Sequence, residues 1–368
     1  MQIISIVPSL APEVNGVGDY GLSLAHRLHQ EYGINTRFII GDPHWRHSSS
    51  VDGFEVNWVD RRSPEVLHKL LADCGSQSAA VLVHYVGHGY ARGGIPFWLI
   101  QGLARWKLQY PSLHLLTMFH EIYTVDPVWN PRFWLSPFQK QLITDLVEMS
   151  DRCITNVSAY AKILSDFSHG KHPSIPILPV FSSVGEPQNI LPLELRKRRL
   201  VIFGQSHSKI SVYRDAIPAL QKICQVLKIQ EILDIGPSSG INNFSIGQLP
   251  VVEAGTLSAL EISDILQNSI AGFLNYDPAC LTKSSIFAAY CAHGIVPINY
   301  QDKHLRADLQ DNKHYLTSSF FTDNSLLGDR EMQEIALNAY NWYQSHKLLV
   351  QANLFASYLN HEDHFYRR

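Results

Sequence analysis

The stretch DPACLTKSSIFAAYCAHGIVPIN (277–299) lies between two apolar runs, and together they predict a strand–helix–strand unit. SIAGFLNY (269–276) comes before it and GIVPINY (294–300) closes it, and both runs are typical of buried strands. The intervening KSSIFAAYCAH predicts one short helix with Ser284 or Ser285 near its N-cap.

The start of that predicted helix favours an anion. Free backbone N–H groups and a partial positive charge are expected there, with Lys283 beside them. Thr282, Lys283, Ser284 and Ser285 together offer amides, hydroxyls and one cation. This combination suits a nucleotide diphosphate.

Strand-like and helix-like segments alternate along the whole chain, which predicts parallel sheets covered by helices on both faces. In the first half we expect strands at 2–8, 35–41, 79–85, 113–120 and 152–158, and helices at 19–32, 64–74, 96–109 and 135–149. In the second half we expect strands at 200–204, 231–236, 250–255, 270–276 and 294–300, helices at 213–228 and 257–269, and a long helical pattern over 329–359.

A segment rich in Pro and charge, 181–199, interrupts the alternation and is typical of a linker. We therefore predict two Rossmann-like, doubly wound α/β domains facing across a cleft, over 1–185 and 186–345, with a helix in 346–368 crossing back to the first domain. The basic run RKRR (196–199) is interpreted as a solvated boundary before a strand.

Composition excludes several classes of protein. The chain has 368 residues, 45% of them hydrophobic and 17% charged, as globular proteins do, and its length suits two domains. A net charge of −3 argues against a nucleic-acid binder that neutralises phosphates. Five scattered cysteines, none in a CxxC pattern, favour reduced thiols in the cytoplasm and no zinc site. MQIISIVPSL resembles a first strand and not a signal peptide, and no run is long enough to span a membrane.

Three further motifs fall where strands are expected to end. Gly16 and Gly18 form a flexible loop before a helix that opens near Asp19, which could bring backbone close to a ligand or serve connectivity alone. His120 and Glu121 follow one strand.

His84, Tyr85 and His88 end the neighbouring strand, so a cluster of His, Glu and Tyr is predicted at the sheet edge where open α/β proteins bind ligands. For any single histidine, an ordinary surface or core role is the alternative. In LVIFGQSHSKISVYRD (200–215), Lys209 and Arg214 could hold a diphosphate or be ordinary surface cations.

Two other features have mainly structural interpretations. The aromatic stretch 128–138 could line an acceptor site or contact a membrane surface, although packing is the commoner role of such stretches. HEDH (361–364) lies at the chain end without further ligands, so we predict no metal site.

Taken in order, these stretches resemble the GT-B glycosyltransferases, most closely the retaining glycosyltransferase family 4. NGVGDY (15–20) is similar to the family's glycine loop, and His120–Glu121 matches the strand-end pair whose histidine lies against the donor sugar. The family pattern E-G-F-G-L-x-x-L-E-A-M-A-x-G-x-P-V-I aligns on Leu281 to Ile298. In this alignment Leu281 and Ala289 replace the two family glutamates that hold the sugar and the ribose, and Gln205 replaces the family's first-loop arginine.

The resemblance implies a retaining transferase that moves a hexose from a nucleoside-diphosphate sugar, for which UDP-glucose is the best guess, to a hydroxyl of a glycan or glycolipid. It implies no metal or other cofactor, and the net charge of −3 predicts no nucleic-acid partner. The implied roles are catalysis by His120 and Glu121, acceptor binding by Asp19, His84 and Tyr85, and donor binding by Gly16, Gly18, Gln205, Lys209, Arg214, Thr282, Lys283, Ser284 and Ser285.

Two alternatives remain open. A GT-B protein that binds a nucleotide sugar or a partner without transfer would explain Leu281 and Ala289. A dehydrogenase with paired Rossmann domains is disfavoured, because the chain lacks GxGxxG after a strand with an acidic residue about twenty residues on.

Overall fold

The computed structural model describes residues 1–13, 15–75, 79–123, 135–241, 245–302, 309–322 and 327–360. The predictions for the HEDH motif and for most of the aromatic stretch 128–138 therefore lie outside the described residues. The chain forms two compact units, one of Met1–Pro179 with the chain from Leu348 onward, the other of Val180–Lys347.

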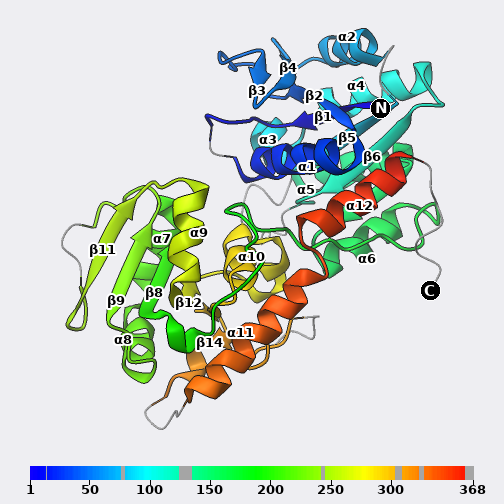
Figure 1. The fold of residues 1–368 in the computed structure, drawn as a ribbon. Helices are drawn as coiled ribbons and strands as arrows, with labels where there is room; N and C mark the ends of the chain where they lie inside the picture. Colours follow the sequence, from blue (N-terminus) through cyan, green and yellow to red (C-terminus); the bar gives the residue numbers. More distant parts are fainter. Residues whose placement is uncertain are drawn as a thin grey trace. The chain divides into compact units, whose positions relative to one another are not determined.

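The first unit contains a sheet of seven strands in the order β3-β4-β2-β1-β5-β6-β7 (Figure 1). All neighbours pair in parallel except β3 and β4, which form an antiparallel hairpin at one edge. The strands are β1 (Gln2–Val7), β2 (Asn35–Ile40), β3 (Ser50–Val51), β4 (Phe54–Trp58), β5 (Ala80–Tyr85), β6 (His114–Phe119) and β7 (Arg152–Thr155). The helices are α1 (Gly16–Tyr32), α2 (Pro64–Gly75), α3 (Gly87–Tyr90), α4 (Phe97–Gln109), α5 (Ser136–Met149), α6 (Ser158–Phe167) and α12 (Leu348–Leu359), with a short 3₁₀ turn η1 (Arg92–Gly94).

The second unit repeats this plan, with strands in the order β10-β11-β9-β8-β12-β13-β14 and an antiparallel β10–β11 edge. The strands are β8 (Lys197–Phe203), β9 (Glu231–Ile235), β10 (Ser245–Ile246), β11 (Leu249–Gly255), β12 (Ser269–Leu274), β13 (Val296–Asn299) and β14 (Leu316–Thr317). The helices are α7 (Ser206–Asp215), α8 (Ile217–Val226), α9 (Ala259–Gln267), α10 (Ser285–Ala292) and α11 (Asp329–Gln344), with 3₁₀ turns η3 (Leu193–Leu195), η4 (Pro278–Lys283) and η5 (Ser318–Phe320).

Both units are Rossmann-like α/β domains, as the alternating pattern predicts. Every residue of β5 (AVLVHY) and of β12 (SIAGFL) is buried, so helices must cover each central strand on both faces. α10 packs on β12 through Tyr290, whose hydroxyl donates to the carbonyls of Val201 and Phe273 at 3.2 Å each. Because the Tyr290 ring fills the space beside Gly272, a Cβ there would lie only 2.6 Å from it.

Three sequence-based expectations about elements were wrong. The helix expected over 213–228 is two helices, because Pro218 cannot continue a helix interior and instead occupies the first turn of α8. The pattern over 329–359 likewise divides into α11 and α12. RKRR is not a solvated boundary: Lys197–Arg199 belong to β8, and Arg196 is buried with its guanidinium donating to the carbonyls of Leu191, Ser269 and His293.

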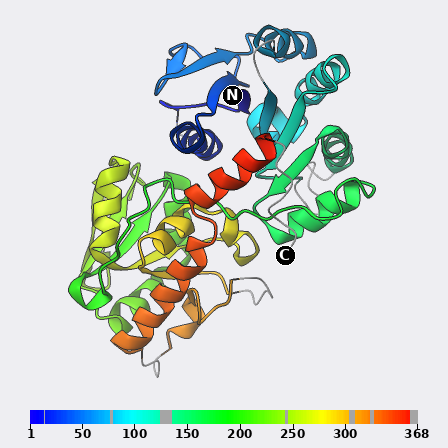
Figure 2. The same cartoon turned by 45° about the vertical axis from the view of Figure 1, so that its right-hand side comes forward.

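Helix α12 belongs to the first unit although it follows the second in sequence. It packs against α1, and both views show the two helices side by side (Figures 1 and 2). Gln351 of α12 is fully buried and makes two short hydrogen bonds: its Oε1 accepts from the Tyr20 hydroxyl at 2.5 Å, and its Nε2 donates to the Pro179 carbonyl at 2.6 Å. These bonds join the last helix to α1 and to the end of the unit's first segment.

The start of α1 provides a test of this packing, because two of its glycines differ in their surroundings. A Cβ on Gly18 would lie 2.0 Å from the Ser9 carbonyl oxygen, whereas a Cβ on Gly16 meets nothing within 4 Å. We expect Gly18→Ala to lower the free energy of unfolding by about 1–3 kcal/mol through overpacking. Gly16→Ala, two residues away, should be neutral or stabilising by up to about 1 kcal/mol. Urea unfolding followed by circular dichroism measures both, and equal effects would contradict the packing described.

Candidate functional site

In the first unit, the carboxyl ends of β1 and β5 mark the point where strand order reverses. The chain leaves β1 through α1 to reach β2 on one side, whereas β5 pairs with β1 on the other side. Open α/β sheets bind ligands in the crevice at such a point. α1 begins at this edge, and His120 follows β6, the strand next to β5.

The N-terminus of α1 is already capped by the chain itself. The Asn15 side chain accepts hydrogen bonds from the amides of Val17 and Gly18 at 3.0 Å each, and the Asp19 amide donates to the Asn15 carbonyl at 2.8 Å. Gly16 is exposed and Gly18 is buried. Asn15 thus occupies amides that an anionic ligand would otherwise bind at the predicted glycine loop.

Asp19 lies in the first turn of α1 and is partly buried. Burial raises the pKa of its carboxyl from 3.8 to about 6. A carboxyl group with such a pKa can exchange a proton near neutral pH. The role of Asp19 in acceptor binding stays a prediction.

The two predicted residues on β5, His84 and Tyr85, point to opposite faces of the sheet because they are consecutive in a strand. Tyr85 lies in the hydrophobic core, and its backbone carbonyl accepts from the His120 amide at 2.9 Å. Its hydroxyl has no hydrogen-bond partner in the described part of the chain, and burial raises its pKa. The two side chains therefore cannot meet the same ligand.

His84, His120 and Tyr20 form a buried cluster under the end of β6. The Nδ1 of His84 lies 3.2 Å from the Nε2 of His120, and the Tyr20 ring contacts the His120 ring edge-on at 4.9 Å between centroids. His84 is fully buried and His120 is 6% exposed, so only His120 reaches the surface. Glu121, next in the chain, is partly buried. Tyr20 was not predicted as a site residue, although it is the last residue of the glycine motif NGVGDY (15–20).

In the second unit, the corresponding reversal point lies between β8 and β12, where glycines bring backbone segments together. A Cβ on Gly236, which follows β9, would lie 2.2 Å from the Gly204 carbonyl oxygen, and both residues have positive φ angles of 117° and 146°. A cavity of about 40 Å³ lies here, with room for about one water and far too small for a nucleotide. Its lining comes from β8, α7, β12 and α10, namely Ile202, Phe203, Ser208, Lys209, Val212, Phe273, Leu274, Asn275, Tyr276 and Ile286.

Lys209, predicted to hold the donor diphosphate, is instead 1% exposed and paired with a buried carboxylate. Its ammonium group donates to Asp234, and also to the Gly236 carbonyl at 3.3 Å, while the Tyr213 hydroxyl donates to the other oxygen of Asp234. Asp234 was not predicted as a site residue. Its acidic side chain lies between apolar residues in the interior of the strand EILDI (231–235), and this position indicates a buried partner. The charge of Lys209 is thus compensated within the protein.

Two other residues of the predicted donor site, Gln205 and Arg214, lie at opposite ends of α7. Gln205 is the N-cap residue of α7 and makes no side-chain capping bond, whereas Arg214 lies in the last turn, 70% exposed and paired with Asp215 at 2.7 Å. Arg214 comes eight positions after Ser206 in this helix, a rise of about 12 Å. Arg214 is therefore not brought to the helix start.

The opening stretch folds as predicted around Ser284, the N-cap of α10, whose hydroxyl accepts from the Phe287 amide at 3.2 Å. Thr282, Lys283 and Ser285 are partly buried at this helix start, and the Thr282 carbonyl accepts from the Val180 amide at 2.8 Å. Leu281 and Ala289, the residues aligned with the family glutamates, are both buried, at 1% and 0% exposure.

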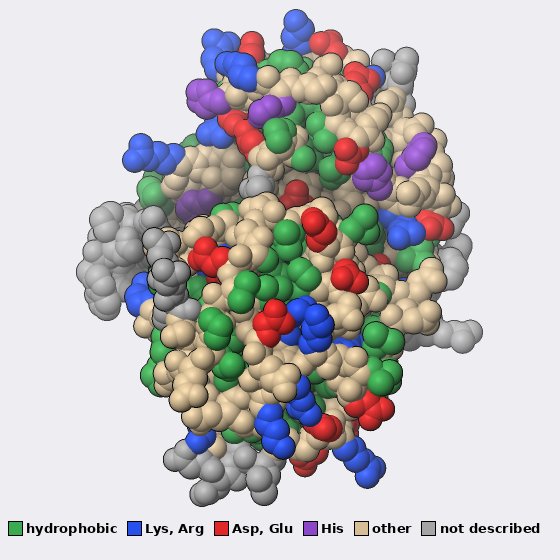
Figure 3. All heavy atoms as spheres, turned by 60° about the vertical axis from the view of Figure 1, so that its left-hand side comes forward, with side chains coloured by type: hydrophobic (Ala, Val, Ile, Leu, Met, Phe, Trp, Pro, Cys, Tyr) green, Lys and Arg blue, Asp and Glu red, His purple; other side chains and the backbone are tan. Residues whose placement is uncertain are grey.

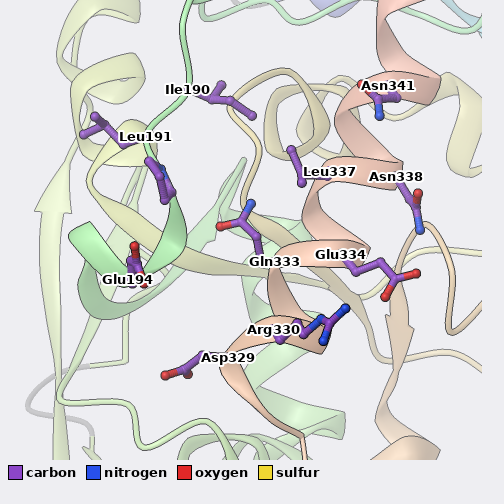
Figure 4. A pocket seen from close by; sticks show the side chains of 11 residues that line it. Ile190, Leu191, Glu194, Asp329, Arg330, Gln333, Glu334, Leu337, Asn338 and Asn341 are labelled. Carbon is purple, nitrogen blue, oxygen red and sulfur yellow. The ribbon is translucent and has the colours of Figure 1, made fainter.

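A larger groove, about 780 Å³ in volume, lies between α11 and the segment 190–194. Figure 4 shows Gln333 and Leu337 on the side of α11 that faces this segment, while Glu334 and Asn338 point away from it. The Gln333 Oε1 accepts from the Leu193 amide at 2.7 Å. Since η3 in this segment precedes β8, the groove lies near the amino end of β8, at the sheet edge opposite the reversal point.

On the face shown in Figure 3, Lys and Arg side chains lie interspersed with Asp and Glu. Among the described residues, no cluster of three or more His, Cys, Asp or Glu could hold a metal ion. Within the same residues, no helix combines the length and apolar character needed to cross a bilayer.

The buried pair in the second unit generates a stability prediction. Asp234→Asn leaves the Lys209 ammonium buried without its counter-charge, so the free energy of unfolding should fall by about 3–5 kcal/mol. The double variant Lys209→Met/Asp234→Asn removes the unpaired charge, keeps an acceptor for Tyr213, and should recover much of this loss. Chemical denaturation measures both, and a double variant no more stable than the single one would refute a buried ion pair.

Asp19 generates a pH prediction. Between pH 3.8 and about 6 its carboxyl holds a proton in the folded protein but not in the unfolded chain, so its contribution to stability grows as pH falls through this range. We expect Asp19→Asn to stabilise the protein at pH 7–8 and to lose this advantage below about pH 4, as thermal denaturation across pH would show. Asp60→Asn, at an exposed position, controls for the change in net charge. Parallel pH curves for Asp19→Asn and wild type would contradict the raised pKa.

No protein-family model and no curated protein sequence matches the chain. Solved structures resemble it along its whole length. The pneumococcal O-GlcNAc transferase GtfA in complex with UDP and GlcNAc matches with a TM-score of 0.64 and 9% identity, covering 99% of each chain. Anabaena Alr3699/HepE in complex with UDP-glucose matches with a TM-score of 0.60 and 9% identity, covering 98% of this chain and 100% of that one.

An alpha-glucosyltransferase in complex with UDP-glucose and DNA containing an abasic site matches with a TM-score of 0.58 and 12% identity, covering 98% and 99% of the two chains. At these identities the likeness concerns the fold. The chain has the two-domain GT-B fold of these glycosyltransferases.

Proposed function

We propose that the chain is a glycosyltransferase that uses a nucleoside-diphosphate sugar. The observation that carries this proposal is the match over 97–99% of the chain to glycosyltransferase structures, several of them in complex with UDP or UDP-glucose. The finer proposal is a retaining transfer of a hexose, with UDP-glucose as the first donor to test.

In the second unit, we propose that the donor diphosphate binds over the reversal point of the sheet. The start of α10 supplies backbone amides and Lys283, and the start of α7 supplies Gln205. Lys283, at the end of η4 and next to this helix start, would offset negative charge on the departing diphosphate.

In the first unit, we propose that the acceptor and the transferred sugar bind around His120, Glu121 and Asp19. An acceptor hydroxyl would form a bond to the anomeric carbon as the bond from that carbon to the diphosphate breaks. The hydroxyl proton would pass to the departing phosphate or to solvent. We propose a carbohydrate or glycolipid acceptor and not nucleic acid, a choice supported by the net charge of −3 and the interspersed charges in Figure 3.

A second candidate function, binding of a nucleotide sugar without transfer, is favoured by one specific observation. Leu281 and Ala289 stand where the family has glutamates, and both are buried apolar residues that cannot accept a hydrogen bond from a sugar or ribose hydroxyl. If contacts to these hydroxyls are missing, the protein binds the nucleotide but positions the sugar poorly.

Calorimetric titration with UDP, GDP and ADP and their hexose conjugates, combined with detection of released nucleotide, tests both candidates. We expect one nucleotide to bind, with slow release from its sugar conjugate. Lys283→Ala should weaken binding about tenfold or more, the size of a lost charge-assisted hydrogen bond.

Two matched variants control this experiment. Lys197→Ala removes the same charge from an exposed residue at the amino end of β8 and should leave affinity unchanged. His120→Ala should retain nucleotide binding but lose release, whereas His29→Ala, at an exposed position of α1, should lose neither. Binding without release across a broad acceptor panel would select the second candidate, and no binding of any nucleotide would refute both.

A further inference from the structure

The two buried histidines share a single hydrogen bond, and its direction determines which nitrogen of His120 carries a proton. The Nδ1 of His84 and the Nε2 of His120 lie 3.2 Å apart, with the rings stacked at 28° and 5.4 Å between centroids. In a neutral pair, one of these nitrogens donates and the other accepts. Which one donates follows from the surroundings of the remaining nitrogen of His84.

That remaining nitrogen, His84 Nε2, is buried and has no hydrogen-bond partner in the described part of the chain. A Cβ built on Gly21 of α1 would lie 3.5 Å from it, so the nitrogen lies next to this glycine. A hydrogen on this nitrogen would find no acceptor and would cost about 1–3 kcal/mol, whereas a lone pair there receives weak C–H contacts.

A charged His84 would carry a proton on both nitrogens, but burial lowers its pKa from 6.5 to about 3. The titratable side chains whose rings contact it are those of Tyr20 in α1 and of His120, which follows β6. His84 is therefore neutral at physiological pH, with one proton on its ring.

We propose that His84 carries its proton on Nδ1, donates it to Nε2 of His120, and so fixes His120 in the tautomer with its hydrogen on Nδ1. His84 is then a positioning residue that acts through His120, and not the acceptor-binding residue expected from the sequence. Its complete burial, against 6% exposure for His120, agrees with this division of roles.

If the chain is the proposed transferase, this tautomer limits what His120 can do in the reaction. With its Nε2 lone pair engaged by His84, His120 is not a general base at neutral pH. Its Nδ1 can then only donate, so any ligand atom that hydrogen-bonds to this nitrogen must be an acceptor, as a sugar hydroxyl or ring oxygen is. The pH–rate profile should then show no limb from titration of His120 between pH 5 and 8.

The test is a long-range ¹H–¹⁵N correlation spectrum of the full-length protein labelled at histidine nitrogens, recorded from pH 5 to 8. We expect both residues to be neutral throughout, with the protonated-type ¹⁵N signal on Nδ1 of each ring. In His84→Leu, which removes the donor, His120 should change to the tautomer protonated on Nε2 and begin to titrate in this range.

Two further variants separate this role from simple packing. His84→Asn retains an N–H near the position of Nδ1 and should restore the wild-type tautomer of His120. Tyr20→Phe keeps the ring that contacts both histidines but removes the hydroxyl bonded to Gln351, and should leave the tautomer unchanged.

A wild-type His120 protonated on Nε2, or an unchanged tautomer in His84→Leu, would overturn the proposal. If His84→Leu does not fold, the wild-type and His84→Asn spectra still decide it. These spectra need no substrate, so their result stands whether or not nucleotide binding supports the proposed transferase.

Discussion

Every residue of β5 and of β12 is buried, so each central strand is covered on both faces and can offer a ligand only what lies at its carboxyl end. This constraint explains why polar groups gather at two places, around His120 in the first unit and around the start of α10 in the second. It also explains the close glycine contacts there. Gly236 lies against Gly204 because the chain segments leaving the adjacent strands β9 and β8 pass within contact distance, and Gly18 lies against Ser9 because the chain turns back on itself between β1 and α1.

The constraint also decides which parts of the fold the sequence could predict. Long apolar runs such as ILDI in β9 and VLVHY in β5 predict buried parallel strands well, because such strands are apolar on both faces. The short edge strands β3, β10 and β14, of two residues each, carry too little pattern to be predicted. The burial of Arg196 could not be predicted either, since its acceptors are carbonyls from residues up to 97 positions away.

The candidate site was predictable in position but not in the roles of its residues. The predicted strand end located His120 directly after β6, and the helix N-cap pattern located Ser284 at the start of α10. The roles of these residues depend on side-chain partners that sequence spacing does not give. Lys209 of α7 resembles a ligand-binding cation in the sequence, but Asp234 of β9 compensates its charge in the structure. His84 and Tyr85 are neighbours in sequence but lie on opposite faces of one sheet.

Charge compensation then narrows where an anionic ligand can bind in the second unit. A buried ammonium that already has a carboxylate partner attracts a diphosphate only weakly, because the pair has almost no net charge. Breaking it to reach a ligand would leave Asp234 buried and unpaired, which costs more than one new contact returns. Arg214 is likewise paired, and it lies about 12 Å from the helix start. The proposed donor site therefore depends mainly on the backbone amides at the start of α10, which follow Lys283 in the chain. The stretch that predicts the strand–helix–strand unit is thus also the part of the second unit on which the proposed donor binding depends.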